Sequence, residues 1–371
     1  MSSTLPSQHR ALVLETIEAG FQVKQVPTPQ PILGTAIVRI AASGVISYLR
    51  EIYNGERQYP FPTPLVGGTS AIGHIAAVGP DATLLQPGQL VFVDCVVRGR
   101  DNPSVMYLPA IHEGLRDGSR KLMRDVWRDG TMAEFAKVPL ENCIPLDEAR
   151  LCRGLGYSLQ DLMYLHYLLV PYGGLRDIKL EPGETVVVCP ATGGFGGAGV
   201  QVAIAMGARV IAMGRNEKEL ARLKEHVKKG TLGANIETVK ITGDEGTDTA
   251  ALQAYGIVDA VLDFSPPAAS KSTHLKSAIA VLRRGGRCSM MGLAEDVMPG
   301  FKVVLDDITL KGKFMYERED MLQFVKILER GLFPTGKNFT DTKIFTLESW
   351  KEAFDAAAEH TGIGKSVVLT P

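Results

Sequence analysis

The sequence of 371 residues predicts an α/β protein with two domains, a β-barrel-like domain and a doubly wound parallel sheet. Three observations lead to this fold class. Short β-rich runs separated by turns fill residues 11–95. From residue 158 onward, apolar runs of strand length alternate with helical segments. A cluster of glycines separates one of these strands from the helix that follows it, which is typical of parallel sheets.

The expected domain boundaries fall where this pattern changes. The β-rich segment and the end of the chain are predicted to form one domain, and the alternating segment forms the other. The two domains comprise residues 1–157 with 331–371, and residues 158–330.

The first domain is predicted from segments of β-branched and small apolar residues bounded by turns such as "QPGQL". Its strands are expected at 35–43, 71–79, 89–97 and 130–139. In contrast, "GSRKLMRDVWRDG" contains several arginines and has apolar residues at helical spacing. Residues 98–130 are therefore predicted to form an irregular lobe or an inserted helix. This lobe is either a solvated or subunit-contact surface, or a cover over the mouth of a site for an anionic or carrier-bound substrate.

The second domain is predicted from alternating strands and helices, which indicate a parallel sheet. Its strands are expected at 184–191, 208–214, 258–265 and 286–293. Its helices are expected at 196–207, 216–229 and 271–286, and a last helix and strand at 350–369.

The composition argues against several classes of partner. A net charge of −1 without a basic cluster predicts no nucleic-acid partner. No apolar stretch is long enough to cross a bilayer, and the N-terminus lacks the pattern of a signal peptide, so no membrane association is expected. The five cysteines are scattered and form no C-x-x-C pair, which favours reduced thiols in a cytoplasmic protein.

The glycine-rich turn is the most informative segment of the sequence. It follows a buried strand that ends at Cys189, and a helix begins near Phe195. Gly193 allows the backbone to approach a pyrophosphate, Gly196 allows the helix to pack closely, and the start of the helix offers free N–H groups. The alternative is a tight turn without a ligand. The predicted cofactor-binding residues here are Ala191, Thr192, Gly193, Gly194, Phe195 and Gly196.

The end of the next strand indicates which dinucleotide is bound. In NAD-binding units an acidic residue at this place binds the ribose 2′-hydroxyl. Here the strand ends at Gly214 without an acid, and Arg215, Asn216 and Lys218 follow. An arginine offers a planar fork to a 2′-phosphate, so the sequence favours NADPH. The alternative is that Arg215 is a solvated residue at the start of a helix, which the neighbouring Glu217 allows.

Three motifs, with the glycine-rich turn, carry a family resemblance. They are "PLVGGTSAIGHIAAVG", "GTMAEFAKVP" and "LEPGETVVV". With them the chain resembles the medium-chain dehydrogenase/reductase superfamily over nearly its whole length. The resemblance implies a GroES-like catalytic domain and a Rossmann domain. It also implies that Leu293, at the end of "SMMGL", faces the nicotinamide, and that the protein is a homodimer, for which the strand-like "TLKGKFMYE" supplies an edge.

The resemblance also indicates where zinc enzymes of the superfamily hold their metal. In this chain those positions hold Ile46, Thr69 and, by a looser alignment, Gly156. Zinc requires thiolate, imidazole or carboxylate ligands, which these residues lack. No metal site is therefore expected, and the chain is similar to the zinc-free quinone oxidoreductases and enoyl or ketone reductases.

Without a metal, hydrogen-bond donors must stabilise negative charge on a substrate oxygen. The resemblance places Tyr48 at the position of the proton-relay hydroxyl, and Ser47 and Thr69 line the same site. For Tyr48, packing without catalysis is an equal alternative. His166, in the apolar segment "MYLHYLL", could contact the substrate, although packing is the simpler interpretation.

These observations predict an NADPH-dependent, metal-independent oxidoreductase. The expected reaction is hydride transfer to an activated C=C bond, as in an enone or quinone, of a small hydrophobic molecule. The alternatives are reduction of a ketone or aldehyde, binding of NADPH without catalysis, and non-redox chemistry such as dehydration. The sequence does not identify the substrate.

Overall fold

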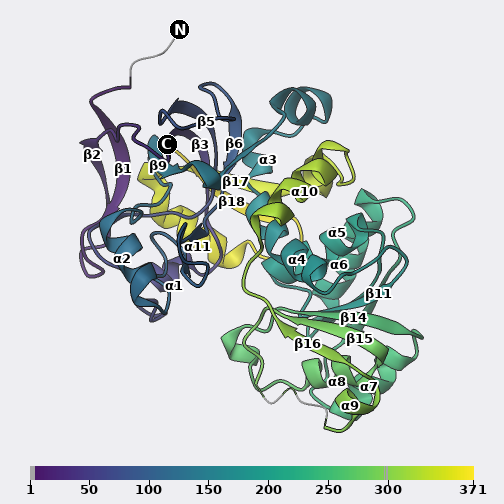
Figure 1. The fold of residues 1–371 in the computed structure, drawn as a ribbon. Helices are drawn as coiled ribbons and strands as arrows, with labels where there is room; N and C mark the ends of the chain where they lie inside the picture. The colour runs from purple at the N-terminus through teal and green to yellow at the C-terminus, as the bar shows by residue number, and fades with distance from the viewer. Residues whose placement is uncertain (1–4, 296, 298–299) are drawn as a thin grey trace. The chain divides into compact units, whose positions relative to one another are not determined.

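The computed structural model describes residues 5–295, 297 and 300–371 (Figure 1). The chain folds into two compact units. Together they contain the helices and strands of an α/β protein, as predicted. Unit 1 comprises Met1–Tyr164, Asp341–His360 and Ser366–Pro371, and unit 2 comprises Leu165–Thr340 and Thr361–Lys365. Among the described residues, no helix is both long enough and apolar enough to span a membrane.

Unit 1 is built on two sheets. The strand pairs that the structure describes in them are antiparallel. The larger sheet has the order β10-β6-β5-β3-β18-β17, and β9 also pairs with β3. Buried side chains of its strands, among them Val38, Ile75 and Val91, form a common core. The predicted strands at 35–43, 71–79, 89–97 and 130–139 are all represented. The strands are β3 (Thr35–Gly44), β5 (Ala71–Val78), β6 (Leu90–Val93), β9 (Phe135–Pro139), β10 (Cys143–Pro145), β17 (Asp341–Thr346) and β18 (Lys365–Thr370).

The smaller sheet has the order β2-β1-β4. Its strands are β1 (Gln8–Leu14), β2 (Phe21–Pro27) and β4 (Leu65–Val66). The helices of unit 1 are α1 (Leu49–Tyr53), α2 (Asp117–Asp125), α3 (Leu159–Leu162) and α11 (Trp350–Glu359).

The arginine-rich segment of unit 1 contains the helix that its spacing predicts. A two-stranded ribbon of β7 (Val97–Arg98) and β8 (Met106–Tyr107) precedes α2. Val97, Tyr107 and Met123 form a small buried cluster that holds the ribbon to the helix. Most of its arginines are engaged in ion pairs within unit 1. The pairs are Arg98–Asp94, Arg100–Glu141, Arg120–Glu113, Arg124–Glu113 and Arg128–Asp129. These pairs make the lobe less suited to attract an anionic substrate.

Unit 2 is a six-stranded parallel sheet with the order β13-β12-β11-β14-β15-β16. The order reverses between β11 and β14, and ligands of such sheets bind at the carboxyl ends of the strands at this point. Buried residues such as Val187, Ile211 and Val261 form the core of the sheet. The strands are β11 (Thr185–Cys189), β12 (Arg209–Gly214), β13 (Ile236–Lys240), β14 (Val258–Asp263), β15 (Leu282–Met290) and β16 (Thr309–Gly312).

Most helices of unit 2 lie between successive strands of this sheet along the chain (Figure 1). They are α4 (Leu165–Asp177), α5 (Gly194–Ala205), α6 (Glu217–Gly230), α7 (Glu245–Gln253), α8 (His274–Ala280), α9 (Lys302–Leu305) and α10 (Arg318–Glu329).

Unit 2 differs from the sequence prediction in several places, which include the unpredicted helices α9 and α10. β13 and α7 were not predicted, because β13 is an edge strand with few buried residues and α7 buries only Asp248 and Leu252. The helix expected to reach residue 286 ends at Ala280, and β15 begins at Leu282. The first part of β15 is exposed and contains Arg283 and Arg284, so its composition gives no strand signal.

Candidate cofactor and ligand-binding sites

The glycine-rich turn lies between β11 and α5, as predicted. Gly193 is the N-cap of α5, with φ −85° and ψ 176°. A Cβ atom at Gly193 would meet no atom within 4 Å, so the space above the turn is open. A Cβ atom at Gly196 would lie 2.0 Å from the Pro190 carbonyl oxygen. The turn thus presents the first N–H groups of α5 to an open space, which suits a phosphate group.

The end of β12 lies directly against this turn. The backbone N–H of Ala191 donates to the Met213 carbonyl oxygen at 2.7 Å. A Cβ atom at Gly214 would lie 2.8 Å from Thr192 Cγ2. The fold therefore brings together two parts of the predicted cofactor site that are more than 20 residues apart.

An open depression follows β12, and its lining residues are Arg215, Asn216, Glu217 and Lys218. Arg215 is exposed and forms no ion pair with any residue that the structure describes. Glu217 instead pairs with Lys240 at 3.1 Å. Asn216 Oδ1 accepts hydrogen bonds from the N–H groups of Lys218 and Glu219, so this oxygen caps α6 and is not free for a ligand. Arg215 and Lys218 are the two cations that line this depression, and neither forms an ion pair with a described residue.

Asp263 connects the loops that follow β14 and β15. Its Oδ1 accepts from Ser265 N at 3.0 Å and from Ser265 Oγ at 2.5 Å. Its Oδ2 accepts from Gly292 N at 3.2 Å. Leu293 N also donates to the Ser265 carbonyl oxygen at 2.8 Å. The exposed Leu293, predicted to face the nicotinamide, is thereby fixed beside the carboxyl end of β14. Asp263 was not predicted as a site residue, although its place at the end of an apolar strand was a possible signal.

Asp263 also belongs to a buried cluster of potential metal ligands with Cys189 and His274, whose ligand atoms lie within 4.8 Å of one another. His274 Nε2 is 2.9 Å from Ser265 Oγ, and His274 Nδ1 is 2.8 Å from Ser272 Oγ. Burial, the Asp263 carboxylate and Cys288 together raise the pKa of the Cys189 thiol well above its usual value. Because both imidazole nitrogens are already within hydrogen-bond distance of serine hydroxyls, the cluster as it stands presents no free imidazole to a zinc ion.

The positions that hold zinc in metal-dependent relatives do not fit a metal either. Ile46 is a buried aliphatic residue, and Gly156 has no side chain. Thr69 offers only a hydroxyl group. We therefore derive no chemical step through zinc at these residues.

In unit 1, Thr69 lies in the short irregular segment between β4 and β5, whose backbone is held by hydrogen bonds. The Tyr53 hydroxyl accepts from Gly68 N at 3.0 Å. Thr131 Oγ1 donates to the carbonyl oxygens of Thr69 at 3.1 Å and Ser70 at 3.3 Å. In contrast, the buried hydroxyls of Thr69 and Ser70 have no hydrogen-bond partner among the described residues. The backbone here is thus held by hydrogen bonds, whereas the two buried hydroxyls are not used by the described part of the chain.

Tyr48, the predicted proton donor, precedes α1 and is half-buried, as is Ser47. The Arg57 guanidinium lies 4.3 Å from the centroid of the Tyr48 ring. Glu51 holds this guanidinium through a hydrogen bond of 2.8 Å, so Glu51 is not an isolated carboxylate. A cation over the face of the ring is attracted to it and helps to fix its orientation. Arg57 was not identified from the sequence, because no motif connects it with Tyr48.

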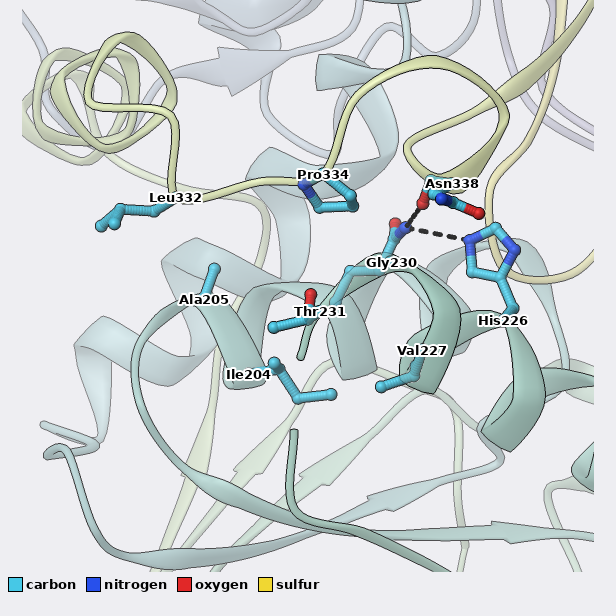
Figure 2. Close-up of a pocket in the computed structure, with 10 residues that line it drawn as sticks. Ile204, Ala205, His226, Val227, Gly230, Thr231, Leu332, Pro334 and Asn338 are labelled. Carbon is cyan, nitrogen blue, oxygen red and sulfur yellow. Dashed lines mark hydrogen bonds between the residues drawn. The ribbon is translucent and has the colours of Figure 1, made fainter. Parts of the chain in front are cut away.

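A second hollow in unit 2 is not part of the nucleotide site. It lies between α5, α6 and the segment from Leu332 to Asn338 (Figure 2). Gln201 Nε2 donates to the Phe339 and Asn338 carbonyl oxygens at 3.2 and 3.4 Å and is 3.4 Å from His226 Nε2. The dashed lines in Figure 2 mark two of these contacts. The Gln201 side chain in this hollow thus connects α5 with the backbone of residues 338 and 339.

Comparison with known proteins agrees with this geometry. The family model "Alcohol dehydrogenase GroES-like domain" matches residues 33–148, and "Zinc-binding dehydrogenase" matches residues 194–330. The chain belongs to the medium-chain dehydrogenase/reductase superfamily. The superfamily comprises oxidoreductases that use a nicotinamide cofactor, NAD or NADP. The match to the zinc-named model covers none of the three positions discussed above.

Relatives of this medium-chain dehydrogenase/reductase include enzymes of more than one kind. Alcohol dehydrogenase 1 of Caenorhabditis elegans is 26% identical over 353 residues, which is 90% of each chain. Acryloyl-coenzyme A reductase of Metallosphaera sedula is 27% identical over 234 residues, which is 61% of this chain and 65% of that protein. A cobalt- and zinc-bound alcohol dehydrogenase structure from Pyrobaculum aerophilum matches with a TM-score of 0.74 and 21% identity, covering 98% of this chain and all of the other. This last likeness shows the fold alone.

Proposed function

We propose that this protein is an NADPH-dependent, metal-independent reductase of an activated C=C bond in a small hydrophobic molecule such as an enone or quinone. The observation that carries the proposal is the acid-free end of β12. Arg215 follows this strand, pairs with no described residue, and lies close in the chain to a strand end that packs against the open glycine-rich turn. The unpartnered hydroxyls of Thr69 and Ser70, at a position without metal ligands, support the metal-independent part.

The chemistry requires a hydride acceptor and an oxyanion stabiliser. A dihydronicotinamide cofactor held at the glycine-rich turn and Arg215 would supply hydride to the β-carbon of the enone, and the C=C electron pair would then move toward the carbonyl oxygen. The resulting enolate accepts hydrogen bonds from Tyr48 and Thr69 in our proposal, with Ser47 as a further donor. A proton then adds to the α-carbon, which gives the saturated ketone and NADP⁺.

A panel of acceptors tests this proposal. Oxidation of NADPH by enones or quinones, without oxidation by simple ketones and aldehydes, is the expected result. Turnover of ketones or aldehydes alone would instead indicate a carbonyl reductase. Binding of NADPH without turnover of any member of the panel would indicate a non-catalytic NADPH-binding protein.

We further propose a cytoplasmic location, where thiols stay reduced. All five cysteines are free, and Cys143, Cys189 and Cys288 are buried. Such thiols require no oxidising compartment.

Replacement of Arg215 tests the choice of cofactor. Arg215→Ala should weaken NADPH binding by about 1.5–3 kcal/mol, the range for hydrogen bonds to charged groups, and leave NADH binding unchanged. Fluorescence titration with both cofactors measures this difference. The matched control is Arg222→Ala, because Arg222 is an exposed arginine on α6 that pairs with Glu219. Equal weakening of both cofactors by Arg215→Ala would show that Arg215 does not bind the 2′-phosphate.

The metal content of the protein tests the proposed independence from zinc. Elemental analysis of the purified protein should find far less than one zinc per chain, and a chelator should leave turnover unchanged, because neither donor set fits zinc. About one zinc per chain, with activity lost on chelation, would contradict the proposal. Loss of that zinc in Cys189→Ser would then assign it to the buried cluster.

We also propose that the protein is a homodimer joined through the edge of the unit 2 sheet. β16 is the edge strand and pairs only with β15 among the described strands. Phe314, just beyond it, is 58% exposed. An edge strand of this kind is stabilised by pairing with a second copy.

Light scattering at micromolar concentration should give twice the mass of one chain, and Phe314→Asp should shift the protein toward the monomer. Leu232→Asp is the control, since Leu232 is 96% exposed and far from β16 in the sequence. A monomeric wild-type protein would overturn the proposal.

A further inference from the structure

His166, in the first turn of α4, is a buried side chain whose hydrogen-bonding groups are not used. It is 6% exposed, and neither ring nitrogen has a hydrogen-bond partner among the described residues. A neutral imidazole carries one donor and one acceptor, and buried groups of this kind are almost always paired. Two nitrogens without a described partner on one buried ring are therefore available to hydrogen-bond a bound ligand.

The surroundings of His166 connect it with the cofactor site of unit 2. Its ring lies edge-on against the Tyr167 ring, with a centroid distance of 4.4 Å. Tyr167 in turn contacts the Phe195 ring at 4.9 Å, and a Cβ atom at Gly194 would lie 2.8 Å from Tyr167 Cε1. Phe195 and Gly194 belong to the glycine-rich turn. His166 is thus one side chain removed from the predicted pyrophosphate site.

Helix α4 also packs against the end of β15. This strand leads to Leu293, the residue predicted to face the nicotinamide. A Cβ atom at Gly174 of α4 would lie 2.3 Å from Met291 Sδ and 3.0 Å from Ser289 Oγ. α4 therefore packs against both the phosphate turn and the segment that precedes Leu293. A polar group on α4 is well placed to meet a ligand that extends from one to the other.

The protonation state of His166 limits the kind of group it can bind. Burial lowers the pKa of His166 to about 3, so the ring is uncharged at neutral pH. An uncharged ring gives a phosphate or carboxylate no ionic attraction, but it can donate a hydrogen bond to a carbonyl oxygen or accept one from an amide.

We propose that His166 is a ligand-binding residue that hydrogen-bonds an uncharged carbonyl or carboxamide group. This group belongs either to the nicotinamide of the cofactor or to the acceptor carbonyl, and the identity of both ligands rests on the proposed function. His166 differs in this respect from Gln201 on α5, which also has a buried atom without a described partner but whose amide nitrogen already bonds to backbone carbonyls.

His166→Phe tests the proposal, because phenylalanine fills the site and removes both nitrogens. The melting temperature should stay the same or rise, since two unpaired polar atoms are lost. The control is His274→Phe, which should lower the melting temperature, because both His274 nitrogens have serine partners. His166→Gln retains a donor and an acceptor and should recover part of the binding.

Three ligands distinguish the two sources of the carbonyl: NADPH, 2′-phospho-ADP-ribose, which lacks the nicotinamide, and 2-cyclohexenone as acceptor. A loss of NADPH affinity of about tenfold or more in His166→Phe, with unchanged affinity for 2′-phospho-ADP-ribose, assigns the contact to the carboxamide. Unchanged NADPH affinity with a tenfold lower kcat/KM for 2-cyclohexenone assigns it to the acceptor.

Two results would overturn the inference. One is a His166→Phe protein whose NADPH affinity and turnover both equal those of the wild-type protein. The same conclusion follows if its NADPH affinity is unchanged and the wild-type protein itself shows no turnover. The other is an equal loss of affinity for NADPH and 2′-phospho-ADP-ribose, which reflects a general structural change. If the wild-type protein binds NADPH but reduces no acceptor, the proposed function fails, while the comparison of the two nucleotides still decides the role of His166.

Discussion

Gly193→Ala should leave the melting temperature unchanged and weaken NADPH binding at least tenfold, whereas Gly196→Ala should impair both. The difference follows from what a Cβ atom would meet at each position. At Gly193 it meets no atom within 4 Å, and φ is −85°, so the fold accepts alanine. The methyl group then occupies the space where a pyrophosphate approaches the turn.

At Gly196 the added Cβ atom would lie 2.0 Å from the Pro190 carbonyl oxygen and 2.9 Å from Ala191 Cα. These are backbone atoms, so the clash is relieved only if α5 moves away from the turn. Such overpacking costs typically about 1–3 kcal/mol of stability, and it displaces the N–H groups that face the phosphate.

Thermal unfolding and NADPH titration of the two variants provide the measurement. Gly183→Ala offers no useful control because φ there is positive, at 88°. Gly246→Ala is suitable, since Gly246 lies on α7, has ordinary φ and has only one neighbouring atom, at 3.6 Å. Normal NADPH affinity in a stable Gly193→Ala protein would show that the phosphates do not approach this turn.

The elements of unit 2 that build the cofactor site were predictable because their signals are local. A fully buried strand, a glycine cluster and an apolar helix follow one another within 21 residues, Thr185 to Ala205, and each has its own pattern. β13 and α7 lie away from the site and bury few side chains, so their patterns are weak.

The hydrogen-bond state of the candidate site residues was not predictable in the same way. Thr131 holds the backbone of Thr69 from 62 residues away, and Tyr53 holds Gly68 from 15 residues away. The unused hydroxyls of Thr69 and Ser70 are therefore a result of tertiary packing. The same reason applies to Arg57, which reaches Tyr48 because Glu51 directs its guanidinium. A sequence shows which residues carry polar groups, but only the fold shows which of these groups remain without a partner.

Tyr48→Phe should lower kcat by about 10²-fold or more and leave NADPH affinity unchanged. The phenol is proposed to stabilise the enolate oxygen that forms when hydride is delivered, and loss of one such donor or general acid has this magnitude. Phenylalanine keeps the ring against which the Arg57 guanidinium lies, so only the hydroxyl is removed.

Two matched variants separate catalysis from packing. Tyr53→Phe removes a buried phenol that accepts the Gly68 N–H, so its main effect should be a lower melting temperature. Thr69→Val removes a hydroxyl that has no hydrogen-bond partner in the described part of the chain, so the protein should stay folded while kcat falls about tenfold, the loss of a single neutral donor.

Steady-state kinetics with an accepted enone, NADPH titration and thermal unfolding should be measured on all three variants. A low kcat with an unchanged melting temperature in Tyr48→Phe assigns the phenol to the chemistry, since a hydroxyl in a structural hydrogen bond would lower both. Wild-type turnover in a stable Tyr48→Phe protein would instead return Tyr48 to a packing role. In that case Thr69 becomes the principal donor, and Thr69→Val, whose backbone remains held by Thr131, should show the larger loss of kcat.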